Sequence, residues 1–176
     1  MKTILITGAT SGIGLAAARK LANSKNNLIL CGRRQYKLDE ISNELSKITN
    51  VLSLCFDISN KNEVNKLLSN LPKEFSSIDI LINNAGNAHG LETIQDGLLD
   101  DWDNMIDSNV KGLLYVSRVI MPKMIELESG HIINIGSLSG REVYEKGNIY
   151  CATKHAVNAI SKSMRIDINK TGIKVS

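Results

Sequence analysis

Five short runs of apolar, strand-forming residues alternate with helix-length segments along this chain, and this alternation most constrains its fold. The runs are rich in Ile, Leu and Val and lack a clear two-residue alternation, as is typical of strands covered on both faces. They occupy Thr3–Thr7, Asn27–Cys31, Val51–Cys55, Ile78–Asn83 and His131–Ile135. Repeated strand–helix units favour a parallel sheet. We therefore expect an α/β fold with a doubly wound parallel sheet, in one domain over residues 1–176.

The intervening segments carry helical patterns. Ser59 is the predicted N-cap of a helix whose apolar residues run from Val64 to Leu71 at i, i+3, i+4, i+7 spacing, and Pro72 ends it. Residues 98–127 hold one long helical pattern or two joined ones, and a further helix is predicted over 148–169.

The last four residues, 173–176, resemble the opening of a sixth strand. Sheets of this type normally have at least six strands. We therefore expect a chain truncated at the start of strand six, whose turnover as written is poor.

Composition excludes several classes of function. The net charge of +3 is small and the basic residues are scattered, which argues against a nucleic-acid partner. No apolar run reaches the roughly 20 residues that span a bilayer, and the start of the chain lacks a signal-peptide pattern. The three Cys are an odd number without metal-ligand spacing, which indicates reduced thiols in a cytoplasmic protein. The three His are scattered, so no metal site is expected.

A glycine-rich turn, Thr7–Gly14, follows the first strand directly. Glycines let the backbone approach a pyrophosphate, and the free N–H groups and dipole of a helix N-terminus favour an anion. The spacing G-x-x-x-G-x-G differs from the usual dinucleotide fingerprint G-x-G-x-x-G, and a tight strand-to-helix turn is the simpler alternative. The glycine-rich turn lies at the first strand–helix junction, and this position favours a phosphate loop in a Rossmann-type sheet.

The second strand ends in Gly32-Arg33-Arg34. Where NAD is bound, an Asp or Glu at this point accepts hydrogen bonds from the ribose. Two guanidinium groups instead suit a 2′-phosphate. The alternative is a solvated charge pair, but cations at a helix start oppose the helix dipole. The pair therefore predicts NADP as the cofactor.

Further candidate residues follow the next strands. Asp57 and Ile58 come after the third, and Asn83–Gly86 after the fourth, at the carboxyl ends where open α/β sheets bind ligands. Ser137 follows the fifth strand, and Tyr150 and Lys154 share one face of the next predicted helix. A hydroxyl and a phenol there could meet one carbonyl oxygen, and a lysine cation favours the phenolate.

These motifs, in this order and spacing, resemble the full set of the short-chain dehydrogenase/reductase family. The resemblance rests on Thr7–Gly14, Asn83–Gly86, Asn109, Ser137 and the Tyr150-x-x-x-Lys154 pair, and it spans nearly the whole chain. It implies that Ser137 holds the substrate oxygen and that Tyr150 exchanges its proton during hydride transfer. It implies that Lys154 binds the nicotinamide ribose and lowers the pKa of Tyr150, and that Asn109 holds a relay water.

The expected NADP-binding residues are Gly8, Ala9, Thr10, Ser11, Gly12, Ile13, Arg33, Arg34, Asp57, Ile58, Asn84, Ala85, Gly86, Tyr150 and Lys154. The expected substrate-binding residues are Ser137 and Tyr150.

The stretches around Cys31–Arg34, Ile78–Gly86, Ile106–Asn109 and Gly130–Ser137 resemble one branch, the NADP-dependent 3-hydroxy acid dehydrogenases. That branch oxidises serine and allo-threonine and reduces malonic semialdehyde. Arg141 could pair with a substrate carboxylate or be a surface residue. A 3-oxoacyl thioester reductase and a catalytically weak, truncated NADP-binding protein are the alternative functions.

The resemblance also implies a homo-oligomer, a dimer or tetramer, in which the helices around 103–127 and 148–169 pair across a two-fold axis. Val157, Ile160 and Met164 form an apolar stripe at i, i+3, i+7 spacing. The alternative is that this stripe packs on the sheet of its own chain. No membrane or nucleic-acid partner is expected.

Overall fold

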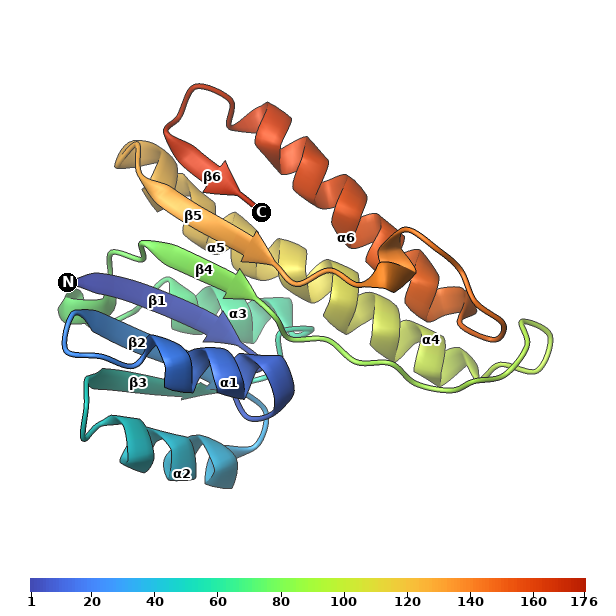
Figure 1. The fold of residues 1–176 in the computed structure, drawn as a ribbon, viewed down its shortest axis with the longest axis horizontal. Helices are drawn as coiled ribbons and strands as arrows, with labels where there is room; N and C mark the ends of the chain where they lie inside the picture. Colours follow the sequence, from blue (N-terminus) through green and yellow to red (C-terminus); the bar gives the residue numbers. More distant parts are fainter.

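A parallel sheet of six strands forms the centre of the structure, a computed structural model that describes residues 1–176 (Figure 1). The order across the sheet is β3-β2-β1-β4-β5-β6, and every neighbouring pair is parallel. The carboxyl ends of the strands therefore meet at one edge, hereafter the carboxyl edge. The strands are β1 Lys2–Thr7, β2 Asn26–Gly32, β3 Asn50–Cys55, β4 Ile80–Asn83, β5 Gly130–Asn134 and β6 Ile173–Val175.

Helices cover both faces of the sheet. Neighbouring residues of each strand point to opposite faces, so each strand contributes to two cores. Leu5 packs in one core cluster with α3, α5 and α6, whereas Ile4 and Ile6 pack in a second cluster with α1 and α2. The helices are α1 Gly12–Leu21, α2 Gln35–Leu45, α3 Lys61–Leu68, α4 Leu99–Ile106, α5 Leu113–Glu126 and α6 Asn148–Asp167. The doubly wound α/β fold expected from the sequence is confirmed.

The boundaries of the elements agree with the predicted patterns except at one cap. The five predicted strands are present with small shifts at their ends, and residues 173–175 form β6 beside β5. The predicted N-cap Ser59 is wrong. Asn60 caps α3, since its side-chain oxygen accepts hydrogen bonds from the N–H groups of Asn62 and Glu63. Ser59 instead donates its hydroxyl to Asp57.

The helical pattern over 98–127 is three consecutive pieces. A π-helical segment, Asp107–Gly112, joins α4 to α5. Such segments are frequent at functional sites because they displace one residue from the regular helical register. This one contains Asn109.

The stripe of Val157, Ile160 and Met164 lies on α6 against the chain's own core. Val157 and Met164 are buried in the same cluster as β5 and α5, and Ile160 packs against that cluster. The stripe therefore follows the alternative interpretation, and it supplies no argument for a partner.

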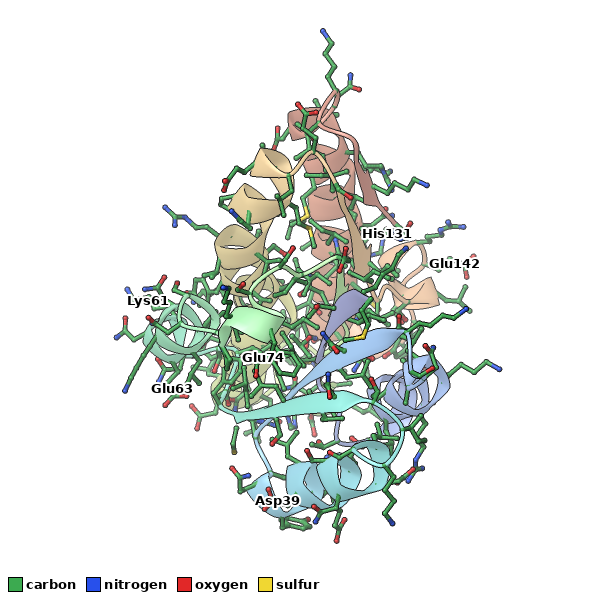
Figure 2. The ribbon with its side chains drawn as sticks, turned by 90° about the vertical axis from the view of Figure 1, so that its left-hand side faces the viewer. Asp39, Lys61, Glu63, Glu74, His131 and Glu142 are labelled. Atoms are coloured by element: carbon green, nitrogen blue, oxygen red, sulfur yellow. The ribbon has the colours of Figure 1, made fainter.

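Charged side chains occupy the outside of the helices. Figure 2 shows Asp39 on α2, Lys61 and Glu63 on α3, and Glu74 in the short helix Lys73–Phe75. All four are exposed.

Candidate active site

A cavity of about 640 Å³ opens at the carboxyl edge of the sheet. Most of the predicted site residues line it, and they come from the ends of β1, β2, β3 and β4 and from α6. They are Gly8, Thr10, Ser11, Gly12, Ile13, Arg33, Arg34, Asp57, Ile58, Asn84, Ala85, Gly86, Tyr150 and Lys154. Of the remaining predicted residues, Ala9 is buried in the core, and neither Asn109 nor Ser137 lines the cavity. The sequence interpretation did not include Asn87, Ala88 and Ser108, which also line it.

The glycine-rich turn passes from β1 into α1 with three glycines in different roles. Gly8 and Gly12 have φ values of +66° and +53°, which glycine adopts at little cost. A Cβ on Gly12 would meet no atom within 4 Å, so the backbone there borders open space. At Gly14 a Cβ would lie 2.3 Å from the carbonyl oxygen of Gly8, so only glycine lets α1 pack against the turn.

The first turn of α1 has free hydrogen-bond donors. Its N-cap, Ser11, makes no side-chain capping bond to the helix. The first N–H groups of a helix have no partner within the helix, and together with the helix dipole they attract an anion. Ser11, Gly12 and Ile13 line the cavity, so this turn is suited to a phosphate group.

Thr7 and Asn84 tie the ends of β1 and β4 together. The Thr7 hydroxyl accepts hydrogen bonds from the N–H groups of Asn84 and Ala85, each at 3.0 Å. The Asn84 side chain donates to the carbonyls of Thr7 and Gly8 at 3.0 and 3.1 Å. The Asn84 amide nitrogen thus holds the phosphate turn in place.

The two arginines after β2 have different partners. Arg33 forms an ion pair with Asp57 at 3.2 Å. Arg34 donates only to hydroxyls, those of Thr10 at 3.0 Å and Ser11 at 3.1 Å, and has no carboxylate partner. Arg34 is therefore the cation available to an anionic ligand beside the phosphate turn.

Asp57 remains anionic in this arrangement. Partial burial by itself raises its pKa, but hydrogen bonds from the N–H and hydroxyl of Ser59 and the guanidinium of Arg33 outweigh burial. The net result is a pKa below the ordinary range for aspartate. A carboxylate thus partly neutralises Arg33 and leaves Arg34 uncompensated.

Tyr150 and Lys154 lie one turn apart on α6, and both line the cavity. The Lys154 ammonium is 5.9 Å from the centre of the Tyr150 ring and donates to the carbonyl of Ile135 at 3.0 Å. Burial lowers the pKa of Lys154, so its ammonium is lost at a lower pH than that of a free lysine.

Ser137 follows β5, as predicted, but its hydroxyl is turned to its own loop. It donates to the Ser139 hydroxyl and accepts from the Ser139 N–H, both at 3.1 Å. No hydrogen bond joins it to Tyr150. Asn109 likewise makes no hydrogen bond to Lys154, and its amide instead holds the backbone of Asn87.

Neither a metal cluster nor a membrane-spanning helix is found. No three His, Cys, Asp or Glu side chains gather where they could hold a metal ion. No helix is both long and apolar enough to cross a bilayer. Cys31 and Cys151 are buried and Cys55 is exposed, all as free thiols.

Comparison with known proteins identifies the family. A family model described as short chain dehydrogenase matches residues 2–176. The chain belongs to this family. The NADP-dependent 3-hydroxy acid dehydrogenase YdfG of Escherichia coli O6:H1 is 42% identical over 173 residues, which cover 98% of this chain and 69% of that protein. An uncharacterized oxidoreductase of Staphylococcus aureus strain USA300 is 42% identical over 175 residues, covering 99% of this chain and 75% of that protein.

Solved structures of short chain dehydrogenases share the fold. Serine dehydrogenase from Escherichia coli superposes with a TM-score of 0.93 at 41% identity, covering 97% of this chain and 78% of that one. The closed form of serine dehydrogenase complexed with NADP⁺ has a TM-score of 0.94 at 41% identity, covering 98% and 69%. The family resemblance inferred from the motifs is confirmed, and the roles of the individual residues stay predictions.

The packing of α1 against the phosphate turn predicts a sharp difference between two glycines. Gly14→Ala places a methyl group against the Gly8 carbonyl and 2.4 Å from the Asn84 amide nitrogen, so one of them must move. We expect the free energy of unfolding to fall by about 1–3 kcal/mol, the usual cost of overpacking.

Gly136→Ala is the matched control, since its added methyl meets no atom within 4 Å. Its effect should stay within about 0.5 kcal/mol in urea unfolding. Equal unfolding midpoints for the two variants would show that α1 does not depend on this close contact.

Proposed function

We propose that this protein is an NADP-dependent oxidoreductase that transfers hydride between NADP(H) and a small alcohol or carbonyl compound. The observation that carries the proposal is the composition of the cavity of about 640 Å³ at the carboxyl edge. Its lining combines a phosphate turn and an uncompensated arginine, Arg34, with a tyrosine–lysine pair, Tyr150 and Lys154. An anion site and an acid/base pair in one cavity are what a dehydrogenase needs.

The residues present fit a dinucleotide phosphate. The backbone at Gly12 borders open space, the first turn of α1 has free N–H donors, and the cavity of about 640 Å³ is within the range of cofactor sites. We assign the pyrophosphate to the turn Gly8–Ile13 and the 2′-phosphate to Arg34, assisted by Ser11. When bound, the nicotinamide of the cofactor donates or accepts the hydride.

Tyr150 serves as the acid/base. In reduction its phenol O–H gives a proton to the substrate oxygen, and in oxidation its oxygen takes the proton of the substrate hydroxyl. The Lys154 cation near the ring stabilises negative charge that develops on the phenol oxygen during this exchange. The Ile135 carbonyl holds the ammonium in place.

Ser137 holds the substrate oxygen in this proposal. Its hydroxyl must turn from Ser139 to do so, which exchanges one hydroxyl–hydroxyl bond at 3.1 Å for a bond to substrate. A hydroxyl rotates freely about its bond, so the exchange requires little rearrangement. We propose that Asn109 holds the relay water, as the family resemblance implies.

The substrate we propose is a small 3-hydroxy acid such as serine or allo-threonine, with malonic semialdehyde as the substrate of the reverse reaction. Support comes from the names of the relatives, a 3-hydroxy acid dehydrogenase and a serine dehydrogenase. Arg141, the candidate partner of the substrate carboxylate, is exposed and makes no ion pair, but it does not line the cavity.

We further propose that the protein is cytoplasmic and forms a homo-oligomer through α4, α5 and α6. Exposed apolar side chains on these helices, which the monomer leaves uncovered, support the second point: Ile106, Leu114, Ile125 and Ile166. Sedimentation at micromolar concentration as a clean monomer would refute the oligomer.

Replacing Tyr150 tests the acid/base proposal. We expect Tyr150→Phe to lower kcat by about 10²- to 10⁴-fold, because the variant loses general acid–base help. NADPH binding should be retained, since the phosphate turn and Arg34 are untouched. Tyr144→Phe, at an exposed tyrosine that does not line the cavity, is the control.

Oxidation of L-serine and L-allo-threonine with NADP⁺ is measured beside reduction of an acetoacetyl thioester with NADPH. Turnover of the thioester alone would replace the proposed substrate by a 3-oxoacyl thioester. A Tyr150→Phe variant that keeps more than about a tenth of the wild-type kcat would show that the proton comes from another group.

A further inference from the structure

A buried threonine on α6 links the turn that carries Tyr150 to the rest of the site. Thr153 is 2% exposed and lies three residues after Tyr150. Its hydroxyl donates to the Tyr150 carbonyl at 2.8 Å and accepts from the Asn109 side-chain amide at 3.1 Å. A hydroxyl can donate and accept at once, and this one does both with groups from two different elements.

The side-chain amide of Asn109 is held in one orientation by three hydrogen bonds. Its nitrogen donates to the Asn87 carbonyl at 2.8 Å and to Thr153. Its oxygen accepts from the Asn87 N–H at 2.8 Å. The Ser108 hydroxyl lies 3.2 Å from the same oxygen, but its single proton is donated to the Asn104 carbonyl at 2.7 Å. Exchanging the positions of the amide oxygen and nitrogen would set carbonyl against carbonyl and N–H against N–H at Asn87, so the amide has a single orientation.

The same amide sets the position of the loop that lines the cavity beside Tyr150. Gly86 and Asn87 are part of that lining. A Cβ on Gly86 would lie 2.9 Å from the Asn109 oxygen, so the loop packs directly on the amide. One chain of contacts therefore runs from the loop through Asn109 and Thr153 to the backbone of Tyr150.

We infer that Thr153 is a positioning residue, which sets Tyr150 relative to the loop at Gly86–Asn87 by holding Asn109 and the first turn of α6 together. The inference rests on the acid/base role proposed for Tyr150. Without the Thr153 hydroxyl, one N–H of the buried Asn109 amide loses its partner, and such a group is costly to leave unsatisfied. Asn109 must then shift to find another acceptor, and the loop moves with it.

Thr153→Val tests this inference, because valine keeps the shape of threonine and removes the hydroxyl. Thr153→Ser, which keeps the hydroxyl, is the rescue variant. The chain also offers a matched control in the same helix, Ser161. Its hydroxyl donates to the Val157 carbonyl at 2.7 Å and accepts from the Asn134 amide at 2.9 Å, the same pattern of bonds about three turns along α6 from Tyr150. Ser161→Ala therefore reports what a lost buried hydroxyl does to stability alone.

The first measurement is hydrogen exchange of the Asn87 backbone amide in the protein without cofactor. We expect Thr153→Val to speed this exchange by about tenfold or more, since the acceptor of that N–H, the Asn109 oxygen, is no longer fixed. Thr153→Ser and Ser161→Ala should leave it near the wild-type rate.

The second measurement separates kcat from cofactor binding. Thr153→Val should lower kcat by about 10- to 100-fold, the scale that misplaced reacting groups cost, with an NADPH Kd within about twofold of wild type. Thr153→Ser should restore kcat to within about threefold. If Thr153→Val does not fold, Thr153→Ala carries the same comparison.

Two results would overturn the inference. One is a Thr153→Val variant with wild-type Asn87 exchange and a kcat within about threefold of wild type. The other is a Ser161→Ala variant that loses as much kcat and as much protection of the Asn87 amide from exchange as Thr153→Val does. That result would show that Thr153 acts only through the general stability of the fold. Tyr150→Phe is assayed alongside. If it is inactive while Thr153→Val is unaffected, only this inference fails, whereas an active Tyr150→Phe overturns the acid/base proposal as well.

Discussion

The Thr7–Asn84 contact is the interaction on which the rest of the site depends. In the sheet, β1 and β4 pair in register through Ile4 to Ile6, and the ladder of hydrogen bonds ends where the two strands pass into loops at the carboxyl edge. Beyond that point, the Thr7 hydroxyl and the Asn84 amide make four hydrogen bonds between the two loops. Buried backbone groups need such partners. Because the phosphate turn and the loop beside Tyr150 start from this contact, it fixes one side of the cavity against the other.

Much of the fold could be predicted from the sequence, since strands buried on both faces must be apolar along their whole length. The few glycines and charged residues next to these runs mark where the strands end. Two local features were harder to predict, the N-cap of α3 and the surface against which the Val157–Met164 stripe packs. Ser59 and Asn60 are both good N-caps, and the choice between them depends on Asp57, which takes the Ser59 hydroxyl. The Val157–Met164 stripe has the same spacing whether it faces the sheet or a partner.

The finer geometry of the site depends on contacts between residues far apart in the sequence. Asn109 and Thr153 are 44 positions apart, and no spacing rule predicts that their side chains meet. The two arginines show the same limit. Adjacent guanidiniums indicate a phosphate site, but only the structure shows that Asp57 pairs with Arg33 and leaves Arg34 uncompensated. An uncompensated arginine forms the stronger charge-assisted hydrogen bonds to an anion, so cofactor preference should depend chiefly on Arg34.

Fluorescence titration with NADPH and with NADH tests the central claim most directly, since it requires neither a known substrate nor turnover. The account predicts that the wild-type protein binds NADPH at least about tenfold more tightly than NADH, which is the effect of one good charge-assisted hydrogen bond. It further predicts that Arg34→Ala abolishes this preference, that Arg33→Ala retains much of it, and that added salt weakens it. Equal or tighter binding of NADH by the wild-type protein would contradict the account.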